Sequence, residues 1–288
     1  MKKAILYTLM FVLLQLAVQF LVTVAWMLLD AAGVEGDSWG MRFSATGMQP
    51  VTLVVATGVF NLLTAVLFVS LRWTPVSASF VRQRRWDVVL WCVMASLGSL
   101  VPSMWFQEQL PELPDTVSAT MLQMMHVPGC FFVIAVLAPV CEELVFRGAV
   151  LRALLRWLNP QRVCCDSAAV KDGSAASVGL TRSQWAAVGL SAVFFALVHG
   201  NPAQMPHAFM IGVLLGWLFA RTGSVVPGLV LHVTNNTLAY LLTAAYPSAD
   251  VSLIDIFGGQ QRSVVMAVCF SFMILLPALY QLHLRCRR

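Results

Sequence analysis

Charged residues are scarce in this sequence of 288 residues: Asp, Glu, Lys and Arg make up 11%, whereas 59% of the residues are hydrophobic. A soluble domain has about 25% charged residues and roughly 45–50% apolar ones. So large an apolar excess cannot be hidden in one soluble core, because a folded soluble domain needs a wettable surface. The composition excludes a soluble enzyme, a disordered protein and a secreted disulfide scaffold, and it predicts an integral membrane protein.

Several patterns are also missing from the sequence. Segments of about ten residues with alternating polarity, which are typical of a membrane β-barrel, do not occur. The seven cysteines lack zinc-type spacing, no HExxH motif is found, and no internal repeat suggests the paired broken helices of a transporter. The net charge of +5 is not arranged as a basic stripe with interleaved aromatic residues, so we expect no nucleic-acid partner.

Long apolar runs predict an all-α, polytopic fold with about eight transmembrane helices. A helix needs about 20 apolar residues to cross a bilayer core of roughly 30 Å. The first run is too long for the apolar part of a signal peptide. The eight predicted spans cover residues 4–29, 50–71, 87–106, 129–158, 183–199, 205–220, 224–245 and 263–284.

The charges between these spans alternate in sign, which predicts that both termini are cytoplasmic. The predicted cytoplasmic segments carry Lys2, Lys3, Arg72, Arg82, Arg84, Arg85, Arg162, Lys171, Arg182, Arg221, Arg285, Arg287 and Arg288. The opposite loops carry Asp30, Glu35, Asp37, Glu108, Glu112, Asp115, Asp250 and Asp255, with Arg42 and Arg262 as basic exceptions. The polar stretch 159–183, rich in Ser, Ala and Gly, is expected to be a flexible cytoplasmic loop.

Span 4 carries three charges, Glu142, Glu143 and Arg147, where each costs at least about 2.5–3.5 kcal/mol. Glu143 and Arg147 are spaced i,i+4 and can pair on one helix face. Glu142 points about 100° away and has no such local partner. It is either a snorkelling interfacial carboxylate or a desolvated one suited to general acid or base catalysis. Pro139, one turn earlier, removes a backbone donor and loosens the helix.

Two of the five histidines lie in spans near polar or aromatic neighbours. His199 ends span 5 one turn after Phe195, and His232 lies in span 7 with Asn236 at i,i+4. Alone, such residues are more often structural, and an Asn can simply join helices. Together with the glutamates they can converge on one cavity between spans 4, 5 and 7, provided that His199 ends its helix at mid-depth. The remaining histidines, at 126, 207 and 283, are interpreted as interfacial or solvated.

The three patterns EExxxR (Glu142, Glu143, Arg147), FxxxH (Phe195, His199) and HxxxN (His232, Asn236) resemble the motifs of the CPBP family. This family, also called Abi, comprises intramembrane endopeptidases of the type II CAAX-protease and bacteriocin-processing group. The similarity covers about residues 127–245. It divides the chain into N-terminal spans 1–3 (1–126), a catalytic core of spans 4–7 (127–245), and a loop, span 8 and basic tail (246–288).

The resemblance implies that Glu142 activates the attacking water with help from His199. His232 and Asn236 would stabilise the oxyanion, and Glu143 with Arg147 would brace the site. These roles suit peptide hydrolysis, which needs a base and oxyanion donors. The family has been described as both metallo-type and glutamate-dependent, so Glu142, His199 and His232 are also candidate zinc ligands, with no cofactor as the alternative.

Three functions follow as hypotheses. The first is an intramembrane endopeptidase acting on a membrane protein or peptide substrate within the lipid bilayer, in a bacterial inner membrane. The second is a non-catalytic scaffold or bacteriocin-immunity protein of the same fold. The third is a transporter with a proton relay, since buried carboxylates and histidines also mark relays. The sequence does not identify the substrate.

Overall fold

The computed structural model describes residues 1–29, 39–82, 85–158, 179–248 and 251–286. Part of the predicted topology lies outside these ranges, including almost all of the 159–183 loop. The loop charges that fall outside the described residues are Asp30, Glu35, Asp37, Arg84, Arg162, Lys171, Asp250, Arg287 and Arg288.

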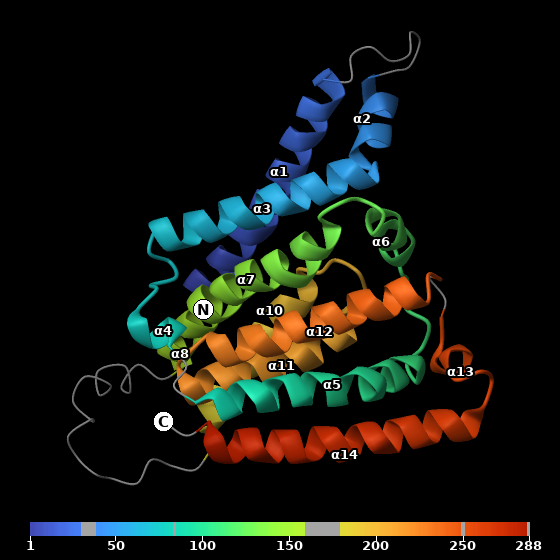
Figure 1. Ribbon diagram of the computed structural model, residues 1–288. Coiled ribbons are helices and arrows are strands. Elements are labelled where there is room, and N and C mark those ends of the chain that lie inside the picture. Colours follow the sequence, from blue (N-terminus) through green and yellow to red (C-terminus); the bar gives the residue numbers. More distant parts are fainter. Residues whose placement is uncertain (30–38, 83–84, 159–178, 249–250, 287–288) are drawn as a thin grey trace.

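The described residues form helices and no strand, which confirms the all-α fold class (Figure 1). The N-terminal part contains α1 (Lys2–Leu29), α2 (Trp39–Gly47), α3 (Pro50–Ser70), α4 (Ala78–Val81), α5 (Trp86–Glu108) and α6 (Ser118–Met124). A long central run follows as η1 (Phe132–Leu137), α7 (Ala138–Glu143), η2 (Leu144–Leu151) and α8 (Arg152–Leu158). The chain continues with α10 (Arg182–Leu197), α11 (Met205–Thr222), α12 (Val226–Ala245), α13 (Leu253–Ile256) and α14 (Gln261–Arg285).

Four of these helices, α1, α3, α5 and α14, are long and apolar enough to cross a membrane. They correspond to predicted spans 1, 2, 3 and 8. Spans 4 to 7 are helical at the predicted places, as the central run and α10, α11 and α12, but they do not meet the same criterion of length and hydropathy. These are also the segments that carry the three motifs. Eight crossings therefore stay a prediction, whereas a polytopic membrane protein is supported by four spans.

Proline and glycine set several helix ends. Proline occupies the first turn of α3, α11 and α12, where its missing N–H breaks no helical bond. Gly223 ends α11 in the left-handed region, with φ 69°, which glycine adopts without strain. These signals allow α11 and α12 to form adjacent helices joined by a tight turn.

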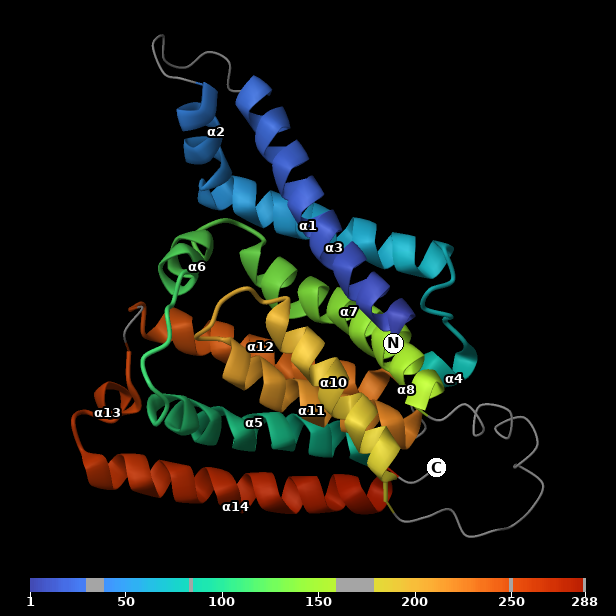
Figure 2. The same cartoon turned by 180° about the vertical axis from the view of Figure 1, so that it is seen from behind.

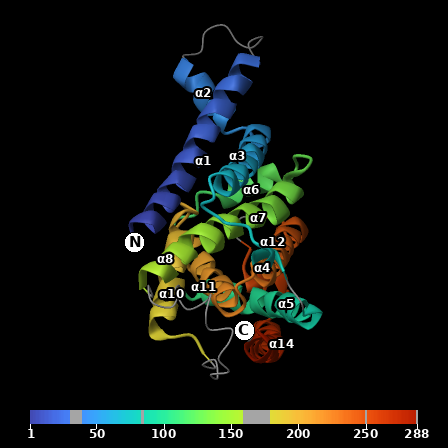
Figure 3. The same ribbon diagram turned by 90° about the vertical axis from the view of Figure 1, so that its left-hand side faces the viewer.

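The central run lies between two groups of helices (Figures 1 and 2). On one side it contacts α3 and α1, and on the other it contacts α12. α10 packs on α11, and α5 lies between α12 and α14. The view from the side shows α1 and α2 leaning away from this body (Figure 3).

A chain of buried phenylalanines joins the groups of helices. Phe11 of α1 meets Phe60 of α3 with ring centroids 4.9 Å apart and Phe146 of η2 at 5.5 Å. Phe146 in turn meets Phe195 of α10 at 5.2 Å. All three contacts are edge-to-face, the arrangement that aromatic quadrupoles favour. A row of aromatic contacts therefore crosses the core that holds the central run and reaches the motif residue Phe195.

Most basic and most acidic residues of the described loops lie at opposite ends of the helices. The end of α3, the start of α5 and the end of α14 lie on one side of the molecule (Figure 1). That side carries the basic residues Arg72, Arg82, Arg85, Arg152, Arg156 and Arg285. The opposite side carries Glu108, Glu112, Asp115 and Asp255. Asp87 at the start of α5 and Arg262 at the start of α14 are exceptions to this separation, and the cytoplasmic orientation of the termini stays a prediction.

Candidate active site

Two π-helical stretches flank the paired glutamates. η1 ends at Leu137 and η2 begins at Leu144, so Glu142 and Glu143 end the short α-helical segment between them. π-turns inside longer helices are rare and concentrate at functional sites. Pro139 lies in the first turn of that segment, which agrees with the loosened helix predicted there.

The Ile134 carbonyl takes its hydrogen bond from another helix. In the i→i+5 pattern of η1 the Ala138 N–H donates to the Val133 carbonyl. In the same pattern the Ile134 carbonyl would accept a hydrogen bond from the backbone N–H of residue 139, but that residue is Pro139, which has no N–H. The side-chain Nδ2 of Asn236 in α12 donates to it instead, at 3.2 Å. Asn236, a motif residue, therefore supplies the hydrogen bond that Pro139 cannot. A backbone carbonyl without any partner would be energetically costly in a membrane.

Glu143 and Arg147 form the predicted buried pair. Glu143 Oε1 lies 3.0 Å from Arg147 Nη1, and each side chain is 1% exposed. The contact is electrostatic, because Nη1 does not point along a hydrogen bond to the carboxylate. Arg147 Nη2 donates to the Gly212 carbonyl at 3.3 Å, and its guanidinium lies 4.7 Å from the Phe195 ring centroid. The arginine thus joins the central run to α10 and α11.

The buried carboxylate of Glu143 packs closely against the backbone of α12 at Gly228. Gly228 lies one turn before His232 in α12, and a Cβ at this glycine would be only 3.1 Å from Glu143 Oε2. That oxygen is buried without a hydrogen-bond partner. A larger residue at Gly228 would therefore push on the Glu143 carboxylate directly.

His232 bridges the two glutamates. Its Nδ1 lies 3.2 Å from Glu143 Oε1, and its Nε2 lies 3.5 Å from Glu142 Oε2. The Nδ1 contact is attractive when the ring donates to Glu143, and the Nε2 contact is attractive when either the ring or Glu142 carries the hydrogen between them. Glu142, Glu143, Arg147 and His232 thus form one connected group of ionisable side chains. Contacts between opposite charges offset part of the cost of burying them.

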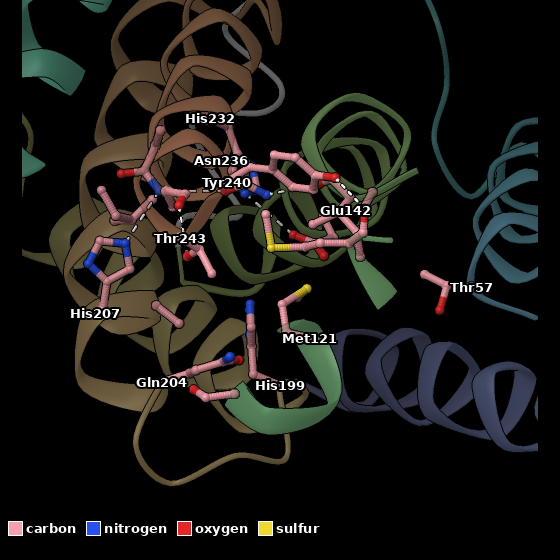
Figure 4. A pocket seen from close by; sticks show the side chains of 18 of the residues that line it. Thr57, Met121, Glu142, His199, Gln204, His207, His232, Asn236, Tyr240 and Thr243 are labelled. Atoms are coloured by element: carbon pink, nitrogen blue, oxygen red, sulfur yellow. Dashed lines mark hydrogen bonds and ion pairs between the residues drawn. The ribbon is translucent and has the colours of Figure 1, made fainter. Parts of the chain in front are cut away.

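Glu142 lies at the boundary of a cavity of about 570 Å³. Its side chain is 18% exposed, against 1% for Glu143, so the two adjacent glutamates have different surroundings. Glu142, His199, His232 and Asn236 all line this cavity, together with residues of α1, α3, α5 and α6 (Figure 4). The structure therefore brings together the four residues that were expected to meet there.

His199 follows the end of α10. Its Nδ1 is 2.7 Å from the Phe195 carbonyl, and its ring packs edge-on against the Phe195 ring at 4.9 Å. A carbonyl only accepts, so Nδ1 is the donor, and Nε2 is left as the acceptor in the neutral ring. The FxxxH spacing thus fixes both the orientation and the tautomer of this histidine.

The turn after His199 is tied to a distant loop. Asn201 is fully buried, its Oδ1 accepts from the Thr116 N–H at 3.2 Å, and its Nδ2 donates to Asp115 Oδ1 at 3.1 Å. Gln107 Nε2 adds a bond to the Ala203 carbonyl at 2.8 Å. We call Asn201, Asp115 and Thr116 the loop clasp. It holds the backbone two residues beyond His199.

Sequence reasoning missed several polar residues of the cavity, among them His207 and Asn235. His207 was interpreted as interfacial or solvated, and this is wrong: it lines the cavity and its Nε2 lies 3.3 Å from Asn235 Nδ2 (Figure 4). Asn235 is 5% exposed, and its Oδ1 is buried without a partner. The signal for Asn235 was the Asn-Asn pair beside the motif. His207 had no local signal, because α11 meets α12 only in the fold.

The three candidate metal ligands are not gathered around one point. No group of three or more His, Cys, Asp or Glu side chains that could hold a metal ion occurs among the described residues. Each ring nitrogen of His232 already has a glutamate oxygen within 3.5 Å, and Nδ1 of His199 donates to a backbone carbonyl. The side chains as arranged therefore do not fit a metal, and we derive no chemical step through one.

Residues 125–238 match a protein-family model, Rce1-like, described as type II CAAX prenyl endopeptidase Rce1-like. The matched segment contains all three motifs, from Glu142 to Asn236. The resemblance that the motifs indicated is thereby confirmed for this segment of the chain. Comparisons with curated proteins and with solved structures gave no match.

Proposed function

We propose that this chain, whose residues 125–238 match the type II CAAX prenyl endopeptidase family, is an intramembrane endopeptidase that hydrolyses a peptide bond of a membrane-associated protein or peptide. The observation that carries the proposal is the position of Glu142. Its carboxylate faces the cavity, while His232, Glu143 and Arg147 contact one another behind it.

Glu142 is the general base in this proposal. A water in the cavity would lose a proton to its carboxylate while the oxygen attacks the scissile carbonyl carbon. His199 lines the same cavity, and its Nε2 can accept a hydrogen bond from the water. As the C–N bond breaks, the proton held by Glu142 passes to the leaving amine, directly or through His199 Nε2, and the carbonyl carbon keeps the oxygen of the water. The bond from His199 Nδ1 to the Phe195 carbonyl holds the tautomer that this role requires.

Asn236 is the better-oriented oxyanion donor. An amide nitrogen carries two hydrogens, and only one is used in the bond to the Ile134 carbonyl. Asn235 Nδ2 lies 3.5 Å from Asn236 Oδ1, so both ends of the amide have a partner. The second N–H is then available to the cavity. A donor held this way needs no reorganisation when negative charge develops on the substrate oxygen.

His232 supports the same oxyanion through a hydrogen on its Nε2. Its Nε2 is 3.5 Å from Glu142, a long contact that can shift towards the substrate when Glu142 takes up a proton. Contacts of this kind are often loose before substrate binds. Glu143 and Arg147 keep the histidine in place, since Glu143 Oε1 contacts both its Nδ1 and Arg147 Nη1. They are positioning residues.

The cavity wall supports a peptide as the substrate. Amide side chains gather there from separate helices, namely Gln15, Gln19, Asn61, Gln107 and Gln204. Amides both donate and accept, as the backbone of an extended peptide does. Apolar residues such as Met104, Met121 and Met125 line the same space and suit flexible apolar groups. We expect the cleaved segment to bind in extended form.

The decisive experiment compares Glu142→Gln with the wild-type chain reconstituted in liposomes. Gln has nearly the same shape but cannot take a proton from water, so hydrolysis of a fluorogenic peptide library should fall roughly 10²–10⁴-fold. Glu112→Gln removes an exposed carboxylate and is the matched control. Unfolding temperatures should agree among the three proteins. An active Glu142→Gln protein would refute the proposal.

Metal dependence is tested on the same samples. If hydrolysis proceeds as proposed, a chelator leaves the wild type active. If zinc takes part, activity and bound zinc fall together, and His199→Ala and His232→Ala lose the metal. A chelator-sensitive enzyme would replace the glutamate mechanism with a metal-dependent one while keeping the protease assignment.

Two other functions stay as alternatives. A scaffold or immunity protein of the same fold would fold normally and cleave nothing in the library. A transporter with a proton relay would move ions across the liposome membrane, which a flux assay detects. The lack of internal repeats and the three complete motifs favour the protease over both.

A further inference from the structure

A second cavity, of about 610 Å³, lies between the start of α1, the segment after α3, and η2 with α8. We call it the basic cavity. The start of α1 lies beside α8 in both views of the ribbon (Figures 1 and 2). The basic cavity shares no lining residue with the candidate active site. It lies on the side of the molecule that carries most of the basic loop residues.

The lining of the basic cavity has one sign of charge. Lys2 and Lys3 come from α1, and Arg152 and Arg156 come from α8. No Asp or Glu is among the described residues that line it. Four cations around one space repel one another, so an anion in their midst would lower the energy of all four.

One of these cations is fixed in place by the fold. Arg152 Nη1 donates to the Pro75 carbonyl at 2.9 Å, and its guanidinium lies 4.6 Å from the Phe80 ring centroid. The other three, Lys2, Lys3 and Arg156, are exposed. The site therefore combines a fixed guanidinium with side chains that are free to close over a ligand.

Aromatic side chains complete the wall. Tyr7 and Trp73 line the cavity with ring centroids 5.3 Å apart, and Trp157 lies on its other side. Tyr and Trp are enriched at the level of lipid headgroups, where one part of the side chain is apolar and another is wet. These aromatic side chains indicate that the cavity lies at the depth of the lipid headgroups. The cations alone would not indicate a depth.

We propose that the basic cavity binds a phosphate group at the membrane surface, as carried by the headgroup of an anionic phospholipid. Basic pockets between transmembrane helices on the cytoplasmic side are suited to anionic headgroups, and each nearby Lys or Arg adds to the attraction. Arginine favours phosphate because its planar guanidinium can donate two parallel hydrogen bonds. A soluble phosphate ester offers the same group without the acyl chains.

The test uses the full chain in a neutral detergent at fixed ionic strength. Binding is measured for short-chain phosphatidylglycerol, for phosphatidylcholine with the same acyl chains, and for glycerol 3-phosphate. We expect phosphatidylglycerol to bind more tightly than phosphatidylcholine, with an affinity that falls as salt rises. Binding of glycerol 3-phosphate as tight as that of the lipid would support the phosphate site and assign a soluble ester as its source.

The variant Lys3→Gln with Arg156→Gln should bind phosphatidylglycerol about 30-fold more weakly, because it removes two cations of the cavity. Both residues are exposed, so folding should not suffer. The matched control is Arg82→Gln with Arg182→Gln, which removes two exposed cations that do not line the cavity. Wild-type affinity in the first double variant, or an equal loss in the control, would overturn the proposal.

Discussion

Asn236 donates through Nδ2 to the carbonyl of Ile134, at 3.2 Å, across the interface between α12 and the central run. This carbonyl lacks a helical donor because Pro139 occupies the position that would supply it. The asparagine of the third motif is therefore both a structural residue and a proposed oxyanion donor. The hydrogen bond to the Ile134 carbonyl orients the side-chain amide of Asn236 for its proposed role as an oxyanion donor.

The two roles of Asn236 can be separated with Pro139→Ala. Asn236→Ala alone should lower the free energy of unfolding by about 1–3 kcal/mol, because the Ile134 carbonyl is left without a partner. It should also lower kcat about 10²–10³-fold if the amide donates to the oxyanion. In a Pro139→Ala background the helix regains an N–H, so the stability cost should shrink. The loss of kcat should remain.

The measurement is a double-mutant cycle on unfolding and on kcat. Coupling in stability with little coupling in kcat supports both roles. If Pro139→Ala restores the activity of Asn236→Ala, the asparagine acts only through the helix. In that case the oxyanion role would be lost.

A second prediction concerns Asn235, whose buried Oδ1 has no partner in the described residues. An N–H of the bound peptide is the natural donor for it. Asn235→Leu should therefore raise KM about 10-fold, which is the signature of lost uniform binding. It also removes the 3.5 Å contact to Asn236 Oδ1, so any accompanying loss of kcat would come from the oxyanion donor. The unfolding temperature should change little, because an unsatisfied acceptor is removed together with the contacts to His207 and to Asn236 Oδ1.

The control for Asn235→Leu is Thr234→Val, on the neighbouring position of α12. The Thr234 hydroxyl donates only to the Val230 carbonyl of its own helix, and the residue does not line the cavity. Its KM should stay at the wild-type value. An unchanged KM in Asn235→Leu would argue that this asparagine is structural.

Local patterns were sufficient to predict much of the fold. Apolar length predicted a span at 50–71 where α3 covers Pro50–Ser70, and one at 205–220 where α11 covers Met205–Thr222. The pairing of Glu143 with Arg147 was also predictable, because i,i+4 neighbours share a helix face whatever the rest of the chain does. The short helices α2, α4, α6 and α13 were not predicted, since they lack a long apolar run.

The cavity could be predicted only in part. The motifs identified Glu142, His199, His232 and Asn236, but the contact of His232 with both glutamates depends on how α12 crosses the central run. No spacing in the sequence encodes that crossing. His207 was missed for the same reason, because its partner Asn235 lies on the next helix.

A third prediction concerns the loop clasp. Asn201→Ala removes two bonds to Asp115 and Thr116 and should lower the free energy of unfolding by about 1–3 kcal/mol. It should also lower kcat by about 10-fold or more, since a small displacement of His199 misaligns it with the substrate. Ser224→Ala, which removes a 3.2 Å bond to the Phe80 carbonyl at a buried position that does not line the cavity, is the control for a general loss of stability.

The clasp should also respond to acid. Burial acts to raise the pKa of Asp115, but hydrogen bonds from Ser118, the Val117 N–H and Asn201 outweigh it, and the pKa is lowered. A carboxyl group with a lowered pKa stabilises the fold above its unfolded value of about 3.9, and this contribution is lost as pH falls through the folded value. The stability difference between wild type and Asp115→Asn should be constant from about pH 5 to 8 and shrink below about pH 4.

The last prediction concerns the buried pair Glu143 and Arg147. Both side chains are 1% exposed, so removing one partner leaves the other as an uncompensated charge. Breaking such a pair costs about 3–5 kcal/mol. Glu143→Gln and Arg147→Gln should each lower the unfolding temperature strongly, whereas the double variant should be more stable than the sum of the single losses implies. It should still fall short of wild type, because Arg147 also bonds the Gly212 carbonyl and Glu143 also contacts His232. Unfolding of all four proteins in the same detergent measures the coupling, and strictly additive losses would mean that the two charges do not stabilise each other.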